Sequence, residues 1–332
     1  MLFSTCPQSK DVAQAEYLRR VEAVAQWSED AGCTGVLVFT DNGLLDPWVV
    51  SQAILRETST LCPLIALQPA YMHPYAAAKM VTSLAYLYGR RVFLNMVAGG
   101  FRNDLRALTD ETPHDERYER LVEYVHVMMH LLTNEKPITF EGRYYRVKNL
   151  RLVPPMPPNL LPGLMVSGSS AAGLAAARAI GAIAVKYPRP PEDEQETADM
   201  AGKSGVRVGI IARPRADEAW RVARERFPED RKGRITHELA VKVSDSSWHH
   251  QLSVRRPEEG GDGDPYWLGP FQHYRTFCPY LVGSYDRVAV DVAGYLRAGF
   301  TTFILDIPPS RAELDHSNEV FRRARALVRQ PS

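Results

Sequence analysis

The sequence of 332 residues predicts a (β/α)₈ barrel. Strand-like and helix-like segments alternate about eight times without a domain break. The strand-like segments are short and continuously apolar, which is typical of a parallel sheet buried on both faces. The length suits a barrel of roughly 250 residues with insertions. No G-x-G-x-x-G pattern follows the first apolar strand, which argues against a dinucleotide-binding sheet. We expect one barrel domain over residues 1–332.

The first part of the chain supplies the repeats before the first insertion. Residues 13–31 carry apolar side chains at helical spacing, and the apolar, β-branched run GVLVF at 35–39 predicts a buried strand. Asp46 is placed to cap a helix whose first position is Pro47. The same criteria predict further helices and strands, namely a helix at 48–57, a strand at 61–67, a helix at 74–87, a strand at 91–97 and a helix at 117–132.

Two segments interrupt the alternation. The alternating FEGRYYRV pattern predicts an inserted β-hairpin over 138–153. Residues 231–280 contain the Gly- and charge-rich RRPEEGGDGDP and the aromatic-rich YWLGPFQHYRTF, and there we predict an insertion that forms a lid. The alternative for 266–280 is an aromatic cluster that packs the insertion onto the barrel. Other expected elements are strands at 164–167, 182–186, 206–211 and 301–305, and helices at 171–180, 192–201, 217–227, 236–243, 285–297 and 311–328.

Composition restricts the class of partner. The net charge of +1 gives no bulk field for nucleic acid or an anionic membrane. The four cysteines lie far apart without metal-ligand spacing, so we expect reduced thiols and no metal. The N-terminus has no charged-then-apolar signal, and no apolar run approaches the length of a membrane span. We expect a cytoplasmic protein.

The stretch MVSGSSAAG at 165–173 is the strongest candidate for a binding site. It predicts a buried strand, a turn of small residues at Gly168, Ser169 and Ser170, and then a helix. The N-terminus of a helix presents unpaired N–H groups and the positive end of its dipole, so the turn suits an anion, and we predict a phosphate. The alternative is that a serine simply caps an ordinary helix.

Further candidates lie where the predicted strands end, because a barrel places its active site there. These positions include Asp41 and the run Ala98-Gly99-Gly100. His114 and Tyr118 are four residues apart and share one face of a helix, where they could hold a phosphate or a planar ring; the alternative is a capped, solvent-facing helix start. With no metal site and no activated nucleophile, the phosphate seat indicates an organic cofactor.

The chain resembles the bacterial luciferase-like, flavin-dependent monooxygenases, most closely the alkanesulfonate monooxygenase branch. The resemblance spans residues 1–328 and includes the runs AGCTGVLVFT, RRVFLNMVAGGFRND, HDERYERLVEYV, SGSSAAGLAAA and VRVGIIARPRADEAW. It implies a (β/α)₈ barrel that uses O₂ as co-substrate and reduced FMN supplied by a separate NAD(P)H:flavin reductase. It also implies a homodimer or homotetramer. By the resemblance, the flavin-binding residues are Asp41, Ala98, Gly99, His114, Tyr118, Gly168, Ser169 and Ser170, with the two serines on the FMN phosphate.

The departures from the branch concern the substrate side. Leu44 stands where the branch has a cysteine, Gly209 replaces the histidine of R-x-H, and the tyrosine of S-G-Y-P is replaced in the run DIPP at 306–309. Arg207 is kept, and Arg275 matches the arginine of the lid. We take Arg207, Arg275 and His273 as candidate catalytic residues, with Tyr280 as a further candidate acid or base.

These departures predict a pocket less polar than a sulfonate site. The hypothesis is that the protein oxidises a small or medium organic substrate, such as a larger organic acid or a carrier-tethered acyl group, in secondary metabolism rather than in sulfonate desulfonation. Hydroxylation, N-oxidation and Baeyer–Villiger-type insertion stay open. The alternatives are a deazaflavin-dependent reductase and a non-catalytic flavin-binding barrel.

Overall fold

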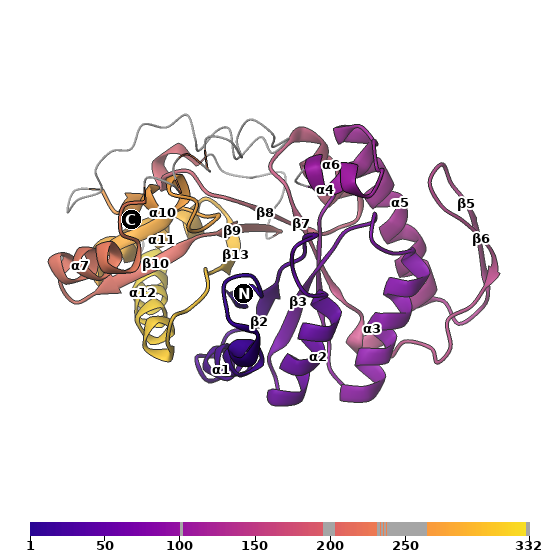
Figure 1. Ribbon diagram of the computed structural model, residues 1–332, viewed down its shortest axis with the longest axis horizontal. Helices are drawn as coiled ribbons and strands as arrows, with labels where there is room; N and C mark the ends of the chain where they lie inside the picture. Colours follow the sequence, from indigo (N-terminus) through magenta and orange to yellow (C-terminus); the bar gives the residue numbers. More distant parts are fainter. Residues whose placement is uncertain are drawn as a thin grey trace. The chain divides into compact units, whose positions relative to one another are not determined.

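The computed structural model describes residues 1–99, 102–194, 203–230, 264–329 and the single positions 233, 235 and 237. Eight strands form a closed barrel in the hydrogen-bonded order β1-β13-β9-β8-β7-β4-β3-β2 (Figure 1). This confirms the predicted (β/α)₈ class. The barrel strands are β1 (Leu2–Thr5), β2 (Gly35–Val38), β3 (Cys62–Leu67), β4 (Phe93–Met96), β7 (Gly163–Ser167), β8 (Ile183–Lys186), β9 (Ser204–Arg207) and β13 (Phe300–Ile304).

The helices follow the strands along the chain, as a barrel requires. Asp46 caps α2 as predicted, since its Oδ1 accepts the backbone N–H groups of Trp48 and Val49. The described helices are α1 (Gln14–Asp30), α2 (Pro47–Glu57), α3 (Pro74–Tyr88), α4 (Arg102–Ala107), α5 (His114–Thr133), α6 (Ala171–Ala179), α7 (Ala216–Arg226), α10 (Gly269–Gln272), α11 (Tyr285–Arg297) and α12 (Arg311–Arg329). None of these helices has both the length and the apolar character that crossing a bilayer needs.

The residues group into two compact units, which are described separately. The N-terminal unit consists of residues 6–29 and 34–184, and the C-terminal unit of residues 1–5, 30–33 and 185–332. The single domain over 1–332 stays a prediction.

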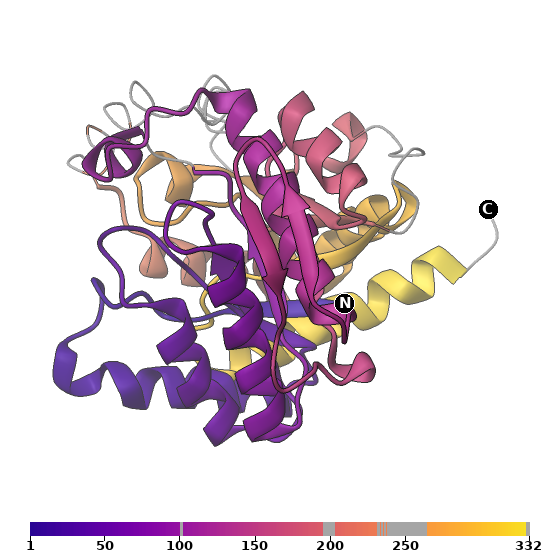
Figure 2. The ribbon, with the colours of Figure 1, turned by 90° about the vertical axis from the view of Figure 1, so that its right-hand side faces the viewer.

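In the N-terminal unit, β2, β3, β4 and β7 are joined by parallel pairings. Their central side chains, among them Leu64 and Leu94, are fully buried. The predicted hairpin is present as the antiparallel strands β5 (Ile138–Glu141) and β6 (Arg146–Leu150). Figure 2 turns this hairpin toward the viewer, alongside α5. The Glu123 carboxylate of α5 accepts backbone N–H groups from the hairpin turn, which attaches the turn to the helix.

In the C-terminal unit, the prediction of one strand over 206–211 is wrong. β9 ends at Arg207 and pairs with β13 in the barrel. β10 (Gly209–Arg213) pairs with β12 (Tyr280–Ser284) in a separate sheet, whose third strand is β11 (Tyr266–Trp267). The change falls at Val208: its N–H donates to Ile304, whereas the N–H of Gly209 donates to Pro279. A mostly apolar run of this length fits one long buried strand or two consecutive ones equally well.

Other expectations differ or lie outside the described residues. Helix α4 was not predicted. Of the helix expected at 192–201, the described part holds only a 3₁₀ turn, Pro191–Asp193, and the helix expected at 236–243 lies outside the described residues apart from position 237. Much of the predicted lid over 231–280 also lies outside them. Its described aromatic part packs on α7, because Trp267 contacts the rings of Trp220 and Phe227, as the packing alternative requires.

Candidate functional site

The turn between β7 and α6 has the geometry of a helix N-terminus open to an anion. Ser170 caps α6, because its Oγ accepts the N–H of Gly173 at 3.1 Å. The alternative that a serine caps the helix is therefore confirmed. It is also compatible with anion binding, since a cap satisfies only part of the first turn and the amides of Ala171 and Ala172 have no intrahelical acceptor.

The side chains of α5 form the wall of this turn. A Cβ on Gly168 would lie 2.5 Å from the Tyr118 hydroxyl, so only glycine fits there. The Tyr118 phenol, whose pKa is raised by burial, hydrogen-bonds with the Ser170 hydroxyl. His114 packs edge-on against Tyr118 with 5.3 Å between ring centroids. The structure thus brings His114, Tyr118, Gly168 and Ser170 together as predicted. Hydroxyl donors and a helix N-terminus fit the phosphate of a flavin nucleotide.

Helix α5 is held in place from outside by the hairpin. The guanidinium of Arg143, at the hairpin turn, forms ion pairs with Glu116 at 2.5 Å and with Glu119 at 3.0 Å. These carboxylates lie one turn apart on the helix that also carries His114 and Tyr118. The hairpin therefore contacts the first two turns of α5, the turns that carry His114 and Tyr118.

The remaining N-terminal candidates lie at the ends of β2 and β4. Asp41 stabilises its own turn, because its Oδ1 accepts the N–H of Gly43 at 2.7 Å. Ala98 is buried, and Gly99 has a φ of 110°, a backbone conformation that favours glycine. Gly100 lies outside the described residues. The sequence reasoning missed the bond from the Ser167 hydroxyl to Asn95 Oδ1 at 2.8 Å. Its signal was an asparagine in an otherwise apolar strand.

In the C-terminal unit, Arg207 is the centre of a second cluster. Its side chain is only 7% exposed. Nη1 donates to the Tyr187 hydroxyl at 3.2 Å, and Nη2 lies 3.7 Å from Asp306 Oδ1. Burial alone would lower the pKa of Arg207, but Tyr187, Cys278 and Asp306 hold it above its ordinary value. Arg207 is therefore a buried, charge-paired cation.

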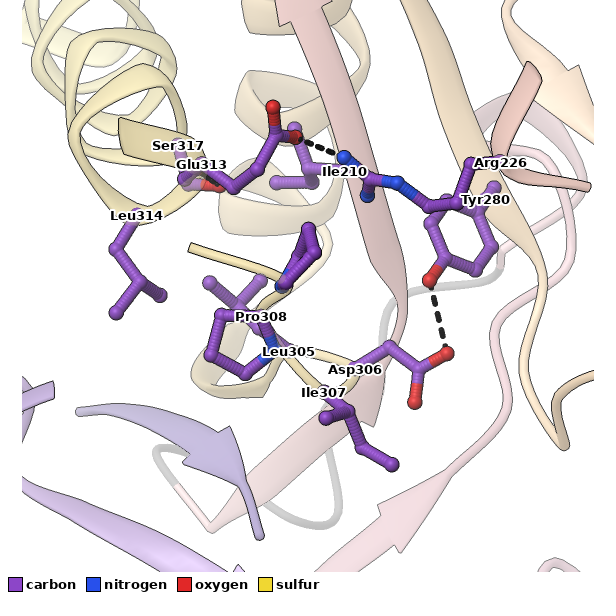
Figure 3. A pocket seen from close by; sticks show the side chains of 11 residues that line it. Ile210, Arg226, Tyr280, Leu305, Asp306, Ile307, Pro308, Glu313, Leu314 and Ser317 are labelled. Carbon is purple, nitrogen blue, oxygen red and sulfur yellow. Dashed lines mark hydrogen bonds and ion pairs between the residues drawn. The ribbon is translucent and has the colours of Figure 1, made fainter. Parts of the chain in front are cut away.

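Asp306 collects further donors at its other oxygen. Oδ2 accepts a hydrogen bond from the hydroxyl of Tyr280 at 2.9 Å (Figure 3). It also accepts one from the hydroxyl of Thr276. Burial and the nearby Asp306 raise the pKa of Tyr280 well above its ordinary value, so the phenol keeps its proton and donates it. The sequence reasoning noted Asp306 only as a strand end and missed Thr276. A threonine in an aromatic-rich segment carries no signal of such a role.

A small polar pocket adjoins this cluster. Figure 3 shows Asp306 below Tyr280 and the side chain of Arg226 extending from beside Tyr280 to Glu313. The Glu313 carboxylate binds two guanidinium groups, that of Arg226 at 2.7 Å and that of Arg213. Burial would raise the pKa of Glu313, but Arg226 and Arg213 hold it below its ordinary value.

The other two catalytic candidates are not part of the Arg207 cluster in the described residues. Arg275 is half exposed and pairs with Asp230 at 2.8 Å. The backbone N–H of His273 closes α10, donating to Gly269 and Phe271. No described contact joins either side chain to Arg207, so their catalytic roles stay predictions.

Tyr280 explains why position 209 is glycine. A Cβ on Gly209 would lie 2.3 to 2.5 Å from three carbon atoms of the Tyr280 ring. The ring itself is wedged edge-on against Phe227, with 5.0 Å between centroids. A larger residue at 209, such as the histidine of the sulfonate branch, and this tyrosine position exclude each other sterically.

We therefore predict that Gly209→Ala lowers the free energy of unfolding by about 2 kcal/mol, because the buried ring cannot move aside without strain. Urea denaturation measures the change. Gly283→Ala is the matched control on the same sheet, since its Cβ would meet Val288 at an ordinary 3.6 Å. Combining Gly209→Ala with Tyr280→Leu should recover part of the loss. Equal stabilities for the two glycine variants would contradict this assignment.

The comparison with protein families settles the class of the protein. The profile of the luciferase-like monooxygenase family matches residues 1–302. The chain belongs to the luciferase-like monooxygenases. As a member, it is an enzyme of the oxidoreductase class, which confirms the family and the class of activity expected from the sequence.

A curated relative and two solved structures are similar over nearly the whole chain. The relative is 4-(gamma-L-glutamylamino)butanoyl-[BtrI acyl-carrier protein] monooxygenase BtrO of Niallia circulans, 35% identical over 312 residues, which cover 92% of this chain and 91% of BtrO. EDTA monooxygenase (EmoA) from Chelativorans sp. BNC1 has a TM-score of 0.74 at 16% identity, covering 100% of this chain and 95% of EmoA. The oxygenating constituent of 3,6-diketocamphane monooxygenase from Pseudomonas putida, in complex with FMN, has a TM-score of 0.71 at 15% identity, covering 96% of each chain.

Proposed function

We propose that this protein is the oxygenase of a two-component system that uses O₂ and reduced FMN, supplied by a separate NAD(P)H:flavin reductase, to oxidise an acyl group tethered to a carrier protein. Secondary metabolism is its proposed setting, and a cytoplasmic homodimer or homotetramer its proposed form. The cofactor proposal rests on one observation: Tyr118 lies against the turn at Gly168 and Ser170, where α6 begins. The similarity to BtrO supports the tethered substrate.

The N-terminal unit would hold the cofactor. The amides at the start of α6, with the hydroxyls of Ser169 and Ser170, would bind the phosphate. Tyr118 and His114 would line the flavin from α5. When bound, reduced flavin supplies the two electrons with which one oxygen atom of O₂ enters the substrate and the other leaves as water. The protein's contribution is then to bind, to orient and to exclude water.

We place the substrate-contacting residues in the C-terminal unit. Arg207, Tyr187, Tyr280 and Asp306 already bind one another, so this cluster offers a fixed surface rather than free charges. A thioester-linked acyl group is neutral at its reacting end. Such a group suits a surface whose charges are already paired better than a sulfonate does.

The test is oxygen incorporation. The purified enzyme would be mixed with a flavin reductase, NADH, FMN and isotope-labelled O₂, and offered butanoyl and 4-aminobutanoyl groups loaded on an acyl-carrier protein. We expect label in the acyl group by mass spectrometry, and none with free butanoate. Consumption of reduced flavin with release of hydrogen peroxide alone would favour the non-catalytic barrel. Anaerobic titration that shows binding of a reduced deazaflavin and not of reduced FMN would favour the reductase instead.

A further inference from the structure

We infer that Asp306 is a specificity-determining residue that occupies, from within the fold, the anion site of Arg207 and thereby excludes substrates with an anionic reacting end. This inference rests on the proposed function, since it concerns the substrate of that site. It commits the site to neutral groups such as the thioester-linked acyl chain.

The first argument is geometric. Arg207 is the cation that the chain retains in the C-terminal cluster, and a carboxylate of the same chain lies 3.7 Å from its Nη2. The cluster also aims two hydroxyl donors, from Thr276 and Tyr280, at the same carboxylate. One guanidinium and two hydroxyls around a single carboxylate make up an anion-binding site that is already filled.

The second argument concerns the other positive charges. Arg226 lines the pocket beside Asp306, but it pairs with Glu313, which also binds Arg213. Each arginine that the described residues place in or beside this cluster therefore has a carboxylate partner. Binding a sulfonate or carboxylate would require one of these buried pairs to break, which leaves a buried charge uncompensated.

The third argument is that Asp306 is held too firmly to move aside for a ligand. Its side chain is 11% exposed, and Tyr280, one of its donors, is wedged between Phe227 and Gly209. A carboxylate on a mobile loop would only compete with an anionic substrate. The Asp306 carboxylate is held by two hydroxyl donors and an ion pair, so it stays in the place that such a substrate would need. Asp306 would therefore give specificity by rejecting anionic substrates, and not by adding an attractive contact to the preferred substrate.

The test removes the Asp306 carboxylate and then measures whether added anions bind in its place. Asp306→Ala removes the carboxylate and leaves the guanidinium and two hydroxyls facing a space of its size. We expect formate and methanesulfonate to bind this variant at least about tenfold more tightly than the unmodified protein, as calorimetry and thermal shift would show. Formamide and methanesulfonamide, which have the same shapes without the charge, should show no such gain.

The matched control is Asp286→Ala, which removes the partner of Arg323 on the surface, where the Asp286 side chain is 84% exposed. It should gain no anion binding. If Asp306→Ala is unfolded in plain buffer, formate should restore its folding and formamide should not. Equal responses of the two variants, or a folding defect that formate leaves unchanged, would overturn the inference. These measurements need neither flavin nor O₂, so a failed oxygen-incorporation experiment would refute the proposed function separately.

Discussion

Ser170→Asp should abolish binding of FMN while leaving α6 folded. Aspartate is as good an N-cap as serine, so its carboxylate can accept the N–H of Gly173 in place of Oγ. The same carboxylate would face the FMN phosphate across the turn. Two negative groups at one helix N-terminus repel each other, and we expect a loss of affinity for reduced FMN of at least about a hundredfold.

Riboflavin separates charge from shape in this experiment, because it carries the same ring system without the phosphate. Anaerobic fluorescence titration should show that Ser170→Asp binds riboflavin about as well as the unmodified protein does. Ser170→Ala is the second comparison: it loses the cap, at a cost of about 1 kcal/mol in the free energy of unfolding, without adding a charge. If Ser170→Asp keeps its affinity for FMN, the phosphate does not bind at this turn.

Glu313→Gln should be the most destabilising conservative change in the C-terminal unit. The carboxylate is the shared partner of Arg213 and Arg226, and the side chains of Glu313 and Arg213 are each only 9% exposed. Its neutralisation leaves two guanidinium groups without a counter-charge, and we expect a loss of about 3 kcal/mol at neutral pH. Glu225→Gln, which breaks a surface pair with Arg221, should cost about 0.5 kcal/mol or less.

The same carboxylate predicts a pH dependence. Because the folded-state pKa of Glu313 is lowered from 4.5, the stability that it contributes is complete above that value. It is lost as the pH falls through the lowered folded-state pKa. The difference in urea midpoint between the unmodified protein and Glu313→Gln should therefore be constant from neutral pH to about pH 5.5 and shrink at more acidic pH. A difference that persists unchanged in acid would show that packing, not charge, is responsible.

The sequence was sufficient for the barrel because buried strands and their following helices are local patterns. The run GVLVF and the Asp46-Pro47 helix start lie where the structure has β2 and α2. The turn at Gly168 to Ser170 could be predicted for the same reason, since the turn and the helix after it lie within a few residues of each other. His114 and Tyr118 were placed together because their separation of four residues fixes their direction on any helix.

The substrate side could not be predicted in the same way, because its contacts join residues far apart in the chain. Nothing near Arg207 indicates that Asp306 lies against it, and nothing near Gly209 indicates the ring of Tyr280. A glycine in a strand signals only that something approaches closely. No pattern in the sequence indicates the break between β9 and β10 at Val208 either, since the residues on both sides are buried and mostly apolar.

The division at Val208 also limits how the chain can change in length. Arg207 is bonded into the barrel sheet and Gly209 into the sheet of β12, so one residue separates two different registers. An inserted or deleted residue here would turn every side chain of β10 to the opposite face, while β9 stayed in place. We expect sequences that share this arrangement to keep an R-x-G spacing, with a tyrosine at the start of the strand paired to that glycine. This combination gives a signature by which family members that share this division between two sheets can be sought.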